Sequence, residues 1–342
     1  MIDVFIGFAF LATATIANKY ALSVLSLSLM VGLRMLVSGV ILFVWHRKKS
    51  DRLTINYIKH DFFKLLGISL LTMLIPALFK AYALKNMLAS KAAFLASLDP
   101  FVTALYSYIL LHERLTKKKI IGIIIGFSGT LVLLISSSGQ EEQLIAWSIL
   151  SYPEISAFLA MAIGRLGWMC VQQLLRKERY NAAEVNGLLM SLSGILAFIS
   201  PFMVAGISTL LAHIPFFTRI SNYTFADAFS IFHLHTTSST NTLLIIFAIF
   251  YTIVIGNVIG YTMYANFLKH HTATFVALAG FSVPLYVYFF SAFLLGEPLS
   301  LNFLCASVIT FIGLLIFYQD EINRISNNGL HPLSWITRHF GK

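Results

Sequence analysis

The chain has 342 residues, of which 58% are hydrophobic and 11% are charged, and its formal net charge is +10. Soluble domains carry about 25% charged residues, so this composition excludes an ordinary soluble globule and indicates a protein that uses lipid as part of its solvent. Cys170 and Cys305 both lie inside apolar runs, which favours small core residues over a disulfide or a metal site.

Ten apolar runs are long enough to cross a bilayer, for which a helix needs roughly 20 residues. The sequence therefore predicts an all-α membrane protein with ten transmembrane helices. The first run follows Met1 without a basic segment and without a small-residue cleavage site after it, so we expect a retained span and not a signal peptide. The expected spans are about 3–22, 27–45, 62–82, 88–111, 118–137, 152–175, 182–206, 242–267, 272–295 and 299–318.

Lysine and arginine are concentrated in alternate connections between these spans. The segments 46–64, 112–119 and 176–181 are basic, whereas the segment 139–151 has no lysine or arginine. Cytoplasmic loops are enriched in these residues, so we expect a multi-pass protein of the cell inner membrane with both termini in the cytoplasm. The net positive charge then follows from topology and does not indicate a nucleic-acid partner.

The chain contains an internal repeat. Residues Ala81 to Leu131 align without a gap with Ala265 to Leu315, at a constant offset of 184 positions, and a weaker match at an offset of 155 pairs Gly32 with Gly187. Each copy holds five expected spans, an odd number, so the second copy must enter the membrane in the opposite direction. We therefore expect two inverted five-helix repeats with a substrate site near the midplane between them. The expected units are residues 1–137, residues 152–318 with an outer insert at about 207–241, and a cytoplasmic tail at 319–342.

Ionisable side chains inside spans cost of order 3 kcal/mol each on insertion scales, which makes them functional candidates. Lys19 and Lys80 lie close enough to span ends to reach the headgroups, a simpler interpretation that stays open for both. Arg34 lies deeper and shares a helix face with Ser38, so it is expected to face a cavity or to form a structural pair. The charged candidates are Lys19, Arg34, Lys80, Asp99 and Arg165.

Asp99 is the sharpest of these candidates because it precedes Pro100 in the middle of a span. The proline removes a backbone donor and disfavours helical geometry at the preceding residue, so a kink is expected there. Thr103 lies one turn further on the same face. Asp99 is expected either to bind a cationic group of a substrate or to carry a proton; the alternative is an ion pair with Arg165 or Arg34 that only holds the packing.

Two further polar stripes lie on other spans. Arg165 and Trp168 are three residues apart on the sixth span, where the guanidinium could hold a carboxylate or phosphate in bidentate geometry beside an indole wall. Asn257 and Tyr261 follow helical spacing on the eighth span. A buried amide within lipid needs a partner, so Asn257 is the stronger candidate of that pair.

A family resemblance is carried by a motif that occurs in both copies. The first copy reads Leu98-Asp-Pro-Phe-Val102, then Leu110-Leu-His-Glu-Arg-Leu115 and a glycine-rich helix, and the second reads Leu294-Leu-Gly-Glu-Pro-Leu299. This pattern resembles the EamA type of the drug/metabolite transporter superfamily and covers about 3–318. The resemblance implies transport of a small molecule, since similar proteins move amino acids, nucleotide-related metabolites, S-adenosylmethionine or drugs.

The leading hypothesis is a secondary transporter, not an enzyme, for a small charged or zwitterionic metabolite such as an amino acid or S-adenosylmethionine. A broad-range drug exporter and a membrane receptor or scaffold are the alternatives. No nucleotide-binding loop occurs, so ATP-driven pumping by this chain alone is not expected. The expected partners are the small-molecule substrate, the lipid bilayer and protons as a coupling ion. We expect no cofactor and no metal, and a monomer or homodimer.

Overall fold

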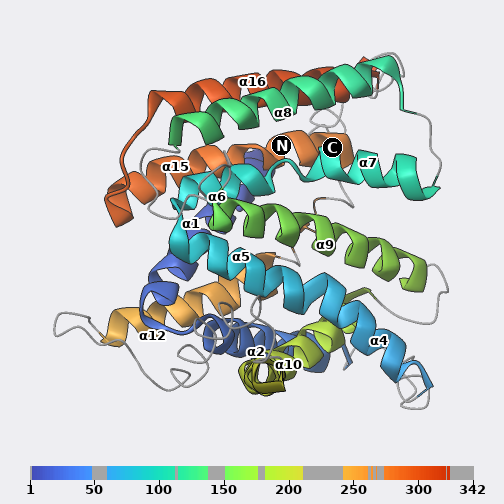
Figure 1. Ribbon diagram of the computed structural model, residues 1–342, viewed down its shortest axis with the longest axis vertical. Helices are drawn as coiled ribbons and strands as arrows, with labels where there is room; N and C mark the ends of the chain where they lie inside the picture. Colours follow the sequence, from blue (N-terminus) through green and yellow to red (C-terminus); the bar gives the residue numbers. More distant parts are fainter. Residues whose placement is uncertain are drawn as a thin grey trace, which may run out of the picture.

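A computed structural model describes residues 2–47, 60–111, 115–137, 151–175, 182–210, 242–260 and 273–320, together with residues 263, 264, 267, 322 and 323. Within these ranges the protein consists of helices and has no β-strand. Most helices run in the same general direction across the molecule (Figure 1). Tyr261, most of the expected insert and nearly all of the expected tail lie outside the described residues.

The helices of the two halves follow the apolar runs of the sequence. The first half contains α1 Ile2–Val24, α2 Leu27–Arg47, α4 Phe62–Ser69, the π-helical segment η1 Leu70–Leu74, α5 Ile75–Asn86, α6 Ala89–Ala96, α7 Asp99–Leu111 and α8 Lys117–Ser137. The second half contains α9 Tyr152–Leu175, α10 Ala182–Leu210, α12 Thr242–Tyr251, the π-helical segment η3 Thr252–Ile259, α14 Ala273–Gly280, α15 Ser282–Leu295 and α16 Leu301–Phe317.

Seven stretches of the described chain are long and apolar enough to cross a membrane. Three of them join consecutive elements, namely Phe62–Asn86 (α4 through α5), Ala89–Ile109 (α6 with most of α7) and Leu278–Leu295 (the end of α14 with α15). The apolar segments Leu243–Ile259 and Leu301–Phe317 are shorter, and α8 begins with three lysines. The helical membrane class is therefore established, whereas the full count of ten spans is not confirmed.

The helix bounds themselves repeat at the offset found in the sequence. α6 and α14 have the same length and lie 184 positions apart, and α8 and α16 start 184 positions apart. Each half also breaks its fourth span at the same place, at Ser97 and Leu98 in the first half and at Phe281 in the second. Pro100 and Pro284 explain these breaks, because a proline cannot donate to the preceding turn and disfavours helical geometry before it.

Equivalent helices of the two halves pack against each other in antiparallel fashion. α2 and α10 lie side by side (Figure 1), and Gly32 of α2 faces Phe198 while Gly39 faces Gly187 and Ser191 of α10. Residues of increasing number along α2 therefore contact residues of decreasing number along α10. The glycines permit this approach, since a Cβ at Gly39 would lie 2.5 Å from the Ser191 backbone nitrogen.

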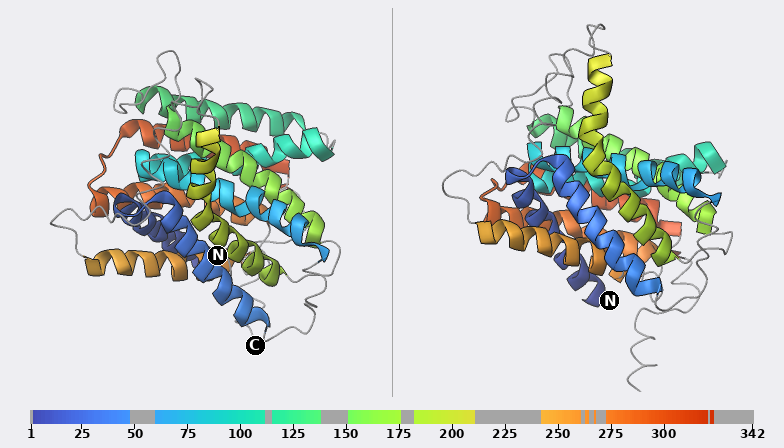
Figure 2. Two further views of the ribbon diagram at one scale, coloured as in Figure 1. Left: turned by 60° about the horizontal axis from the view of Figure 1, so that its bottom comes forward. Right: turned by 90° about the horizontal axis from the view of Figure 1, so that it is seen from below.

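The same arrangement occurs on the opposite side of the bundle from α2 and α10, where α8 and α16 form a second close pair (Figures 1 and 2). Gly122 faces Gly313 and Phe317, whereas Gly129, two turns later, faces Ala306 and Thr310. Small residues that allow backbones to approach are the usual contacts between helices in membranes. Both pairs thus join corresponding helices of the two halves in antiparallel orientation.

The remaining helices lie between these two pairs and carry most of the charged side chains. α9 packs against α5 and η1, and α1 packs against α15, α12 and η3. One hydrophobic core joins α1, α2, α5, α9 and α10, and a second joins α6, α7, α8, α15 and α16. The C-terminal part of α10, which contains Pro201, extends past the other helices in the right-hand view of Figure 2.

Candidate functional site

Asp99 and Arg165 form a two-point ion pair inside the bundle. Arg165 Nε donates to Asp99 Oδ1 over 2.8 Å, and the guanidinium also contacts Asp99 Oδ2. Asp99 lies near the centre of the span Ala89–Ile109, at the helix break, and Arg165 lies inside the span Tyr152–Val171. The exposed fractions of the two side chains are 36% and 25%. The structure thus contains the ion pair with Arg165 that the sequence offered, together with Arg34 as another partner, as the alternative to a binding role of Asp99.

Other side chains around this pair have different roles. Tyr264 and Tyr318, both from the second half of the chain, lie in the neighbourhood of the Arg165 guanidinium. The Thr103 hydroxyl donates to the Asp99 carbonyl oxygen over 2.8 Å, so it is used within its own helix. Trp168 is partly buried and packs against the hydrophobic core. The two tyrosines were not among the side chains that helical spacing had connected with Arg165.

Arg34 and Lys80 form a second group, from α2 and α5. Lys80 is exposed and lies near enough to Arg34 for their positive charges to repel each other. None of the described carboxylates forms an ion pair with Lys80. Asn257 of η3 donates to Ser38 Oγ over 3.1 Å and to the Arg34 carbonyl oxygen over 3.4 Å. The sequence predicts that Asn257 needs a hydrogen-bond partner, and the structure provides that partner on α2. Two neighbouring cations within spans repel each other, and an anionic group would relieve that repulsion.

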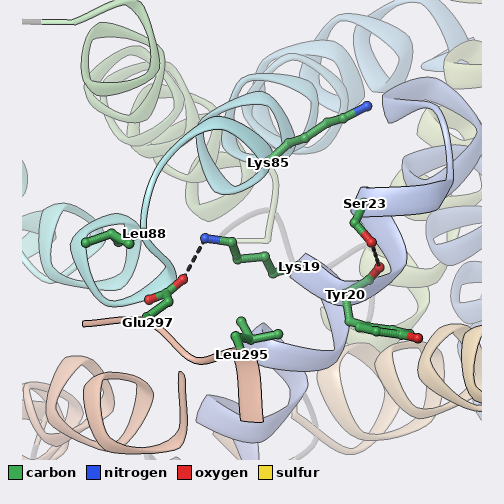
Figure 3. Close-up of a pocket in the computed structure, with 7 residues that line it drawn as sticks. All are labelled: Lys19, Tyr20, Ser23, Lys85, Leu88, Leu295 and Glu297. Carbon is green, nitrogen blue, oxygen red and sulfur yellow. Dashed lines mark hydrogen bonds and ion pairs between the residues drawn. The ribbon is translucent and has the colours of Figure 1, made fainter. Parts of the chain in front are cut away.

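Lys19 lies apart from both groups, at the end of the bundle where α5 ends and α6 begins. Its Nζ donates to Glu297 Oε1 and to the Met87 carbonyl oxygen, both over 2.6 Å. Glu297 follows α15, and its two oxygens also accept from the Ala89 backbone N–H over 2.8 and 3.0 Å. These contacts border a pocket of about 250 Å³ (Figure 3). Lys19 is thus bound to a carboxylate and does not simply reach into the headgroups.

A second ion pair near the same end was missed by the sequence reasoning. Lys91 of α6 pairs with Glu154 of α9, and their side chains are 2% and 3% exposed. Glu154 Oε2 also accepts from the Ser151 backbone N–H over 2.6 Å. The pattern Ser151-Tyr-Pro-Glu154 is a capping box that marks a helix start, so Glu154 had a local signal. Lys91 had no local signal in the sequence other than its charge within an apolar run.

Metal binding has no candidate among the described residues, since no group of three His, Cys, Asp or Glu side chains there lies close enough to hold an ion. The charged side chains instead make a set of pairs at two depths. Lys19 with Glu297 and Lys91 with Glu154 lie at the end where α6 and α9 begin, and Asp99 with Arg165 lies further inside. Such a set can recognise a small molecule that carries charges of both signs.

Known proteins that this chain is similar to are membrane transporters. The model of the EamA-like transporter family matches residues 1–135 and 185–319. A protein of Chlamydia muridarum named S-adenosylmethionine/S-adenosylhomocysteine transporter is 25% identical over 92% of this chain and 91% of its own length. A protein of Chlamydia trachomatis serovar L2 with the same name is 24% identical over 92% of this chain and 88% of its own length.

Two further similarities extend over most of the chain. A protein of Acidianus ambivalens named as an uncharacterized transporter is 24% identical over 87% of this chain and 98% of its own length. One solved crystal structure superposes with a TM-score of 0.54 at 17% identity, over 92% of this chain and 93% of that chain. At that identity the likeness concerns the fold alone.

Proposed function

This chain belongs to the EamA-like transporter family, and we propose that it carries S-adenosylmethionine and S-adenosylhomocysteine across the membrane. It is a multi-span membrane protein with a small-molecule substrate and is a transporter, not an enzyme. The finer proposal, the identity of the cargo, is supported by the two relatives that bear this name and by the charges inside the spans.

The observation that carries the proposal is the occurrence of both signs of charge at membrane depth. S-adenosylmethionine has a carboxylate, an ammonium, a sulfonium and a purine. Arg34 and Lys80 would hold the carboxylate, because two neighbouring cations gain from an anion between them. Asp99 would take the sulfonium or ammonium in exchange for part of its contact with Arg165. Tyr264 and Tyr318 would offer aromatic surface to the purine.

The transport cycle that we propose is alternating access between the two inverted halves. The antiparallel packing of α2 on α10 and of α8 on α16 supports it, since rocking of one half against the other would expose a central site to each side in turn. The uncovered surface of the Asp99–Arg165 pair is expected to face water, because charge against hydrocarbon is expensive. We also propose that Asp99 is the group through which protons couple to transport.

Uptake of radiolabelled S-adenosylmethionine into vesicles preloaded with S-adenosylhomocysteine tests this proposal directly. Exchange-driven uptake is expected in vesicles with the protein and not in empty ones. Asp99→Asn retains the shape and removes the charge, so transport or its pH dependence should be lost while expression remains normal. Arg34→Lys retains charge but loses the planar fork, so the apparent affinity should fall about tenfold. Lys64→Gln, an exposed lysine at the start of α4, is the matched control and should have no effect.

Two results would contradict the assignment. Absence of exchange with either compound, by a folded protein, would reject this cargo. If Arg165→Met is inert by itself but restores transport to Asp99→Asn, the two residues form a structural pair. Cargo recognition would then depend on the group around Arg34, Lys80 and Asn257.

A further inference from the structure

The buried carboxylate of Glu297 occupies a site that is built to receive a carboxylate. Its side chain is 8% exposed and accepts from Lys19 Nζ over 2.6 Å and from the Ala89 backbone N–H over 2.8 and 3.0 Å. Ala89 is the first residue of α6. A lysine beside a helix N-terminus is a favourable place for any anion, because the free N–H groups and the helix dipole both attract negative charge.

Glu297 reaches this position from the other half of the chain. The preceding residue, Gly296, ends α15 with a left-handed backbone (φ 68°) that other residues rarely adopt. The segment 296–300 between α15 and α16 is therefore held against α1 and α6 by one side chain. Removal of that carboxylate from its donors would break this polar link between the halves, while the packing of α15 on α1 and α6 remains.

An open pocket of about 250 Å³ lies directly beside this ion pair. Figure 3 shows Lys19 reaching towards Glu297 on one side, with Lys85 on another wall and its ammonium directed away from Glu297. Lys85 is exposed and forms no ion pair with any described carboxylate. Pockets for whole drug-sized ligands occupy about 300–1,000 Å³, so this one suits the end group of a ligand and not a complete nucleoside.

We propose that this pocket is the loading site for the carboxylate of the cargo, and that Glu297 is the internal carboxylate which the cargo displaces. The inference rests on the proposed function and adds a second site to it. The cargo carboxylate first meets Lys85 at the open side and then takes the donors of Glu297, namely Lys19 and the Ala89 N–H. Release of Glu297 removes the polar link between the α15–α16 segment and helices α1 and α6.

Sidedness distinguishes this loading site from the central site. The pocket lies at one end of the bundle, so its residues affect cargo that approaches from that side only. Uptake by intact cells and uptake by inverted membrane vesicles measure the two directions separately. Lys85→Gln is expected to raise the KM for S-adenosylmethionine about three- to tenfold in one direction and to leave the other unchanged. Lys64→Gln, at the opposite end of the span Phe62–Asn86, removes the same charge and should change neither.

Glu297→Gln provides a test with the opposite sign. It removes the competing carboxylate and leaves Lys19 more available, so the KM should fall in the direction that Lys85→Gln impairs. A purely structural role for Glu297 predicts no decrease in KM. If this variant does not fold, decarboxylated S-adenosylmethionine replaces it as the probe. That compound lacks only the carboxylate, and the difference in KM between it and S-adenosylmethionine should shrink in Lys85→Gln in the same single direction.

The outcomes separate this inference from the proposed function. Equal changes of KM in both directions, or none, in Lys85→Gln would overturn the loading site while transport itself remains. If the wild-type chain exchanges neither compound, the proposed cargo is wrong, and saturation-transfer NMR with free methionine on the purified protein still tests the pocket. Methionine contact that is present in the wild type and in Lys64→Gln but lost in Lys85→Gln supports the site. Contact that is absent, or unchanged in Lys85→Gln, refutes it.

Discussion

Replacement of Lys91 by methionine is expected to destabilise the protein strongly. Its partner Glu154 has only 3% of its side chain exposed, and among the described residues its other hydrogen bond comes from the Ser151 N–H. Removal of one partner from a buried pair leaves an uncompensated charge and costs about 3–5 kcal/mol. The free energy of unfolding, measured by titration with a denaturing detergent in mixed micelles, should fall by about that amount. Lys118→Met breaks an exposed pair with Asp320, 43% and 40% exposed, and should cost less than about 1 kcal/mol.

The double variant Lys91→Met/Glu154→Gln completes the test. It removes both charges, and the glutamine oxygen can still accept from the Ser151 N–H. The double variant should therefore be more stable than Lys91→Met alone, with a coupling free energy of at least about 1 kcal/mol in the cycle. If Lys91→Met costs no more than Lys118→Met, or if the two changes are additive, the buried pair does not contribute as the structure implies.

Two further predictions concern packing and topology. A Cβ at Gly194 would lie 2.5 Å from the Leu36 backbone nitrogen, so Gly194→Ala should separate α2 from α10 and lower the free energy of unfolding by about 1–3 kcal/mol. A Cβ at Gly67 meets nothing within 4 Å, so Gly67→Ala should be neutral. Equal free energies of unfolding for the two variants would contradict the close packing of α2 on α10. A cysteine at position 140, in place of Gln140, should react with an impermeant thiol reagent from outside the cell, and one in place of Ser50 should not. The reason is that the connection containing Ser50 is rich in lysine and arginine, which favours the cytoplasmic side. Reversed labelling would overturn this orientation of the chain in the membrane.

The parts of the fold that depend on local chemistry were predictable from the chain. Long apolar runs predicted helices of membrane-spanning length, and Pro100 predicted a break at Asp99 that the structure places between α6 and α7. The repeat at an offset of 184 recurs in the bounds of α6 and α14. These features depend on residues within one or two helical turns, so sequence neighbours contain the necessary information.

Partner choice could not be predicted in the same way. The sequence left Arg165 and Arg34 open as ion-pair partners of Asp99, and only the packing of α7 against α9 places Arg165 beside it. Glu297 is not among the binding candidates of the sequence, and nothing in the order of residues connects it with Lys19, which is 278 positions away. Two charged residues of the same sign at similar positions in their spans look alike in the sequence. Only the distances between side chains in the folded protein show which of them forms the ion pair.

The sequence by itself determined the helical membrane class of the protein, its helices and its internal sequence repeat, since burial in lipid acts on each apolar run separately. Only the tertiary structure decided which charges meet. Antiparallel contact of α2 with α10 and of α8 with α16 brings the two halves together through glycines. The packing of α15 against α1 and α6 accompanies the contact of Glu297 of one half with Lys19 and Ala89 of the other. An ion pair needs an approach of about 4 Å, and such an approach between distant residues is a property of helix packing and not of the order of residues in the chain.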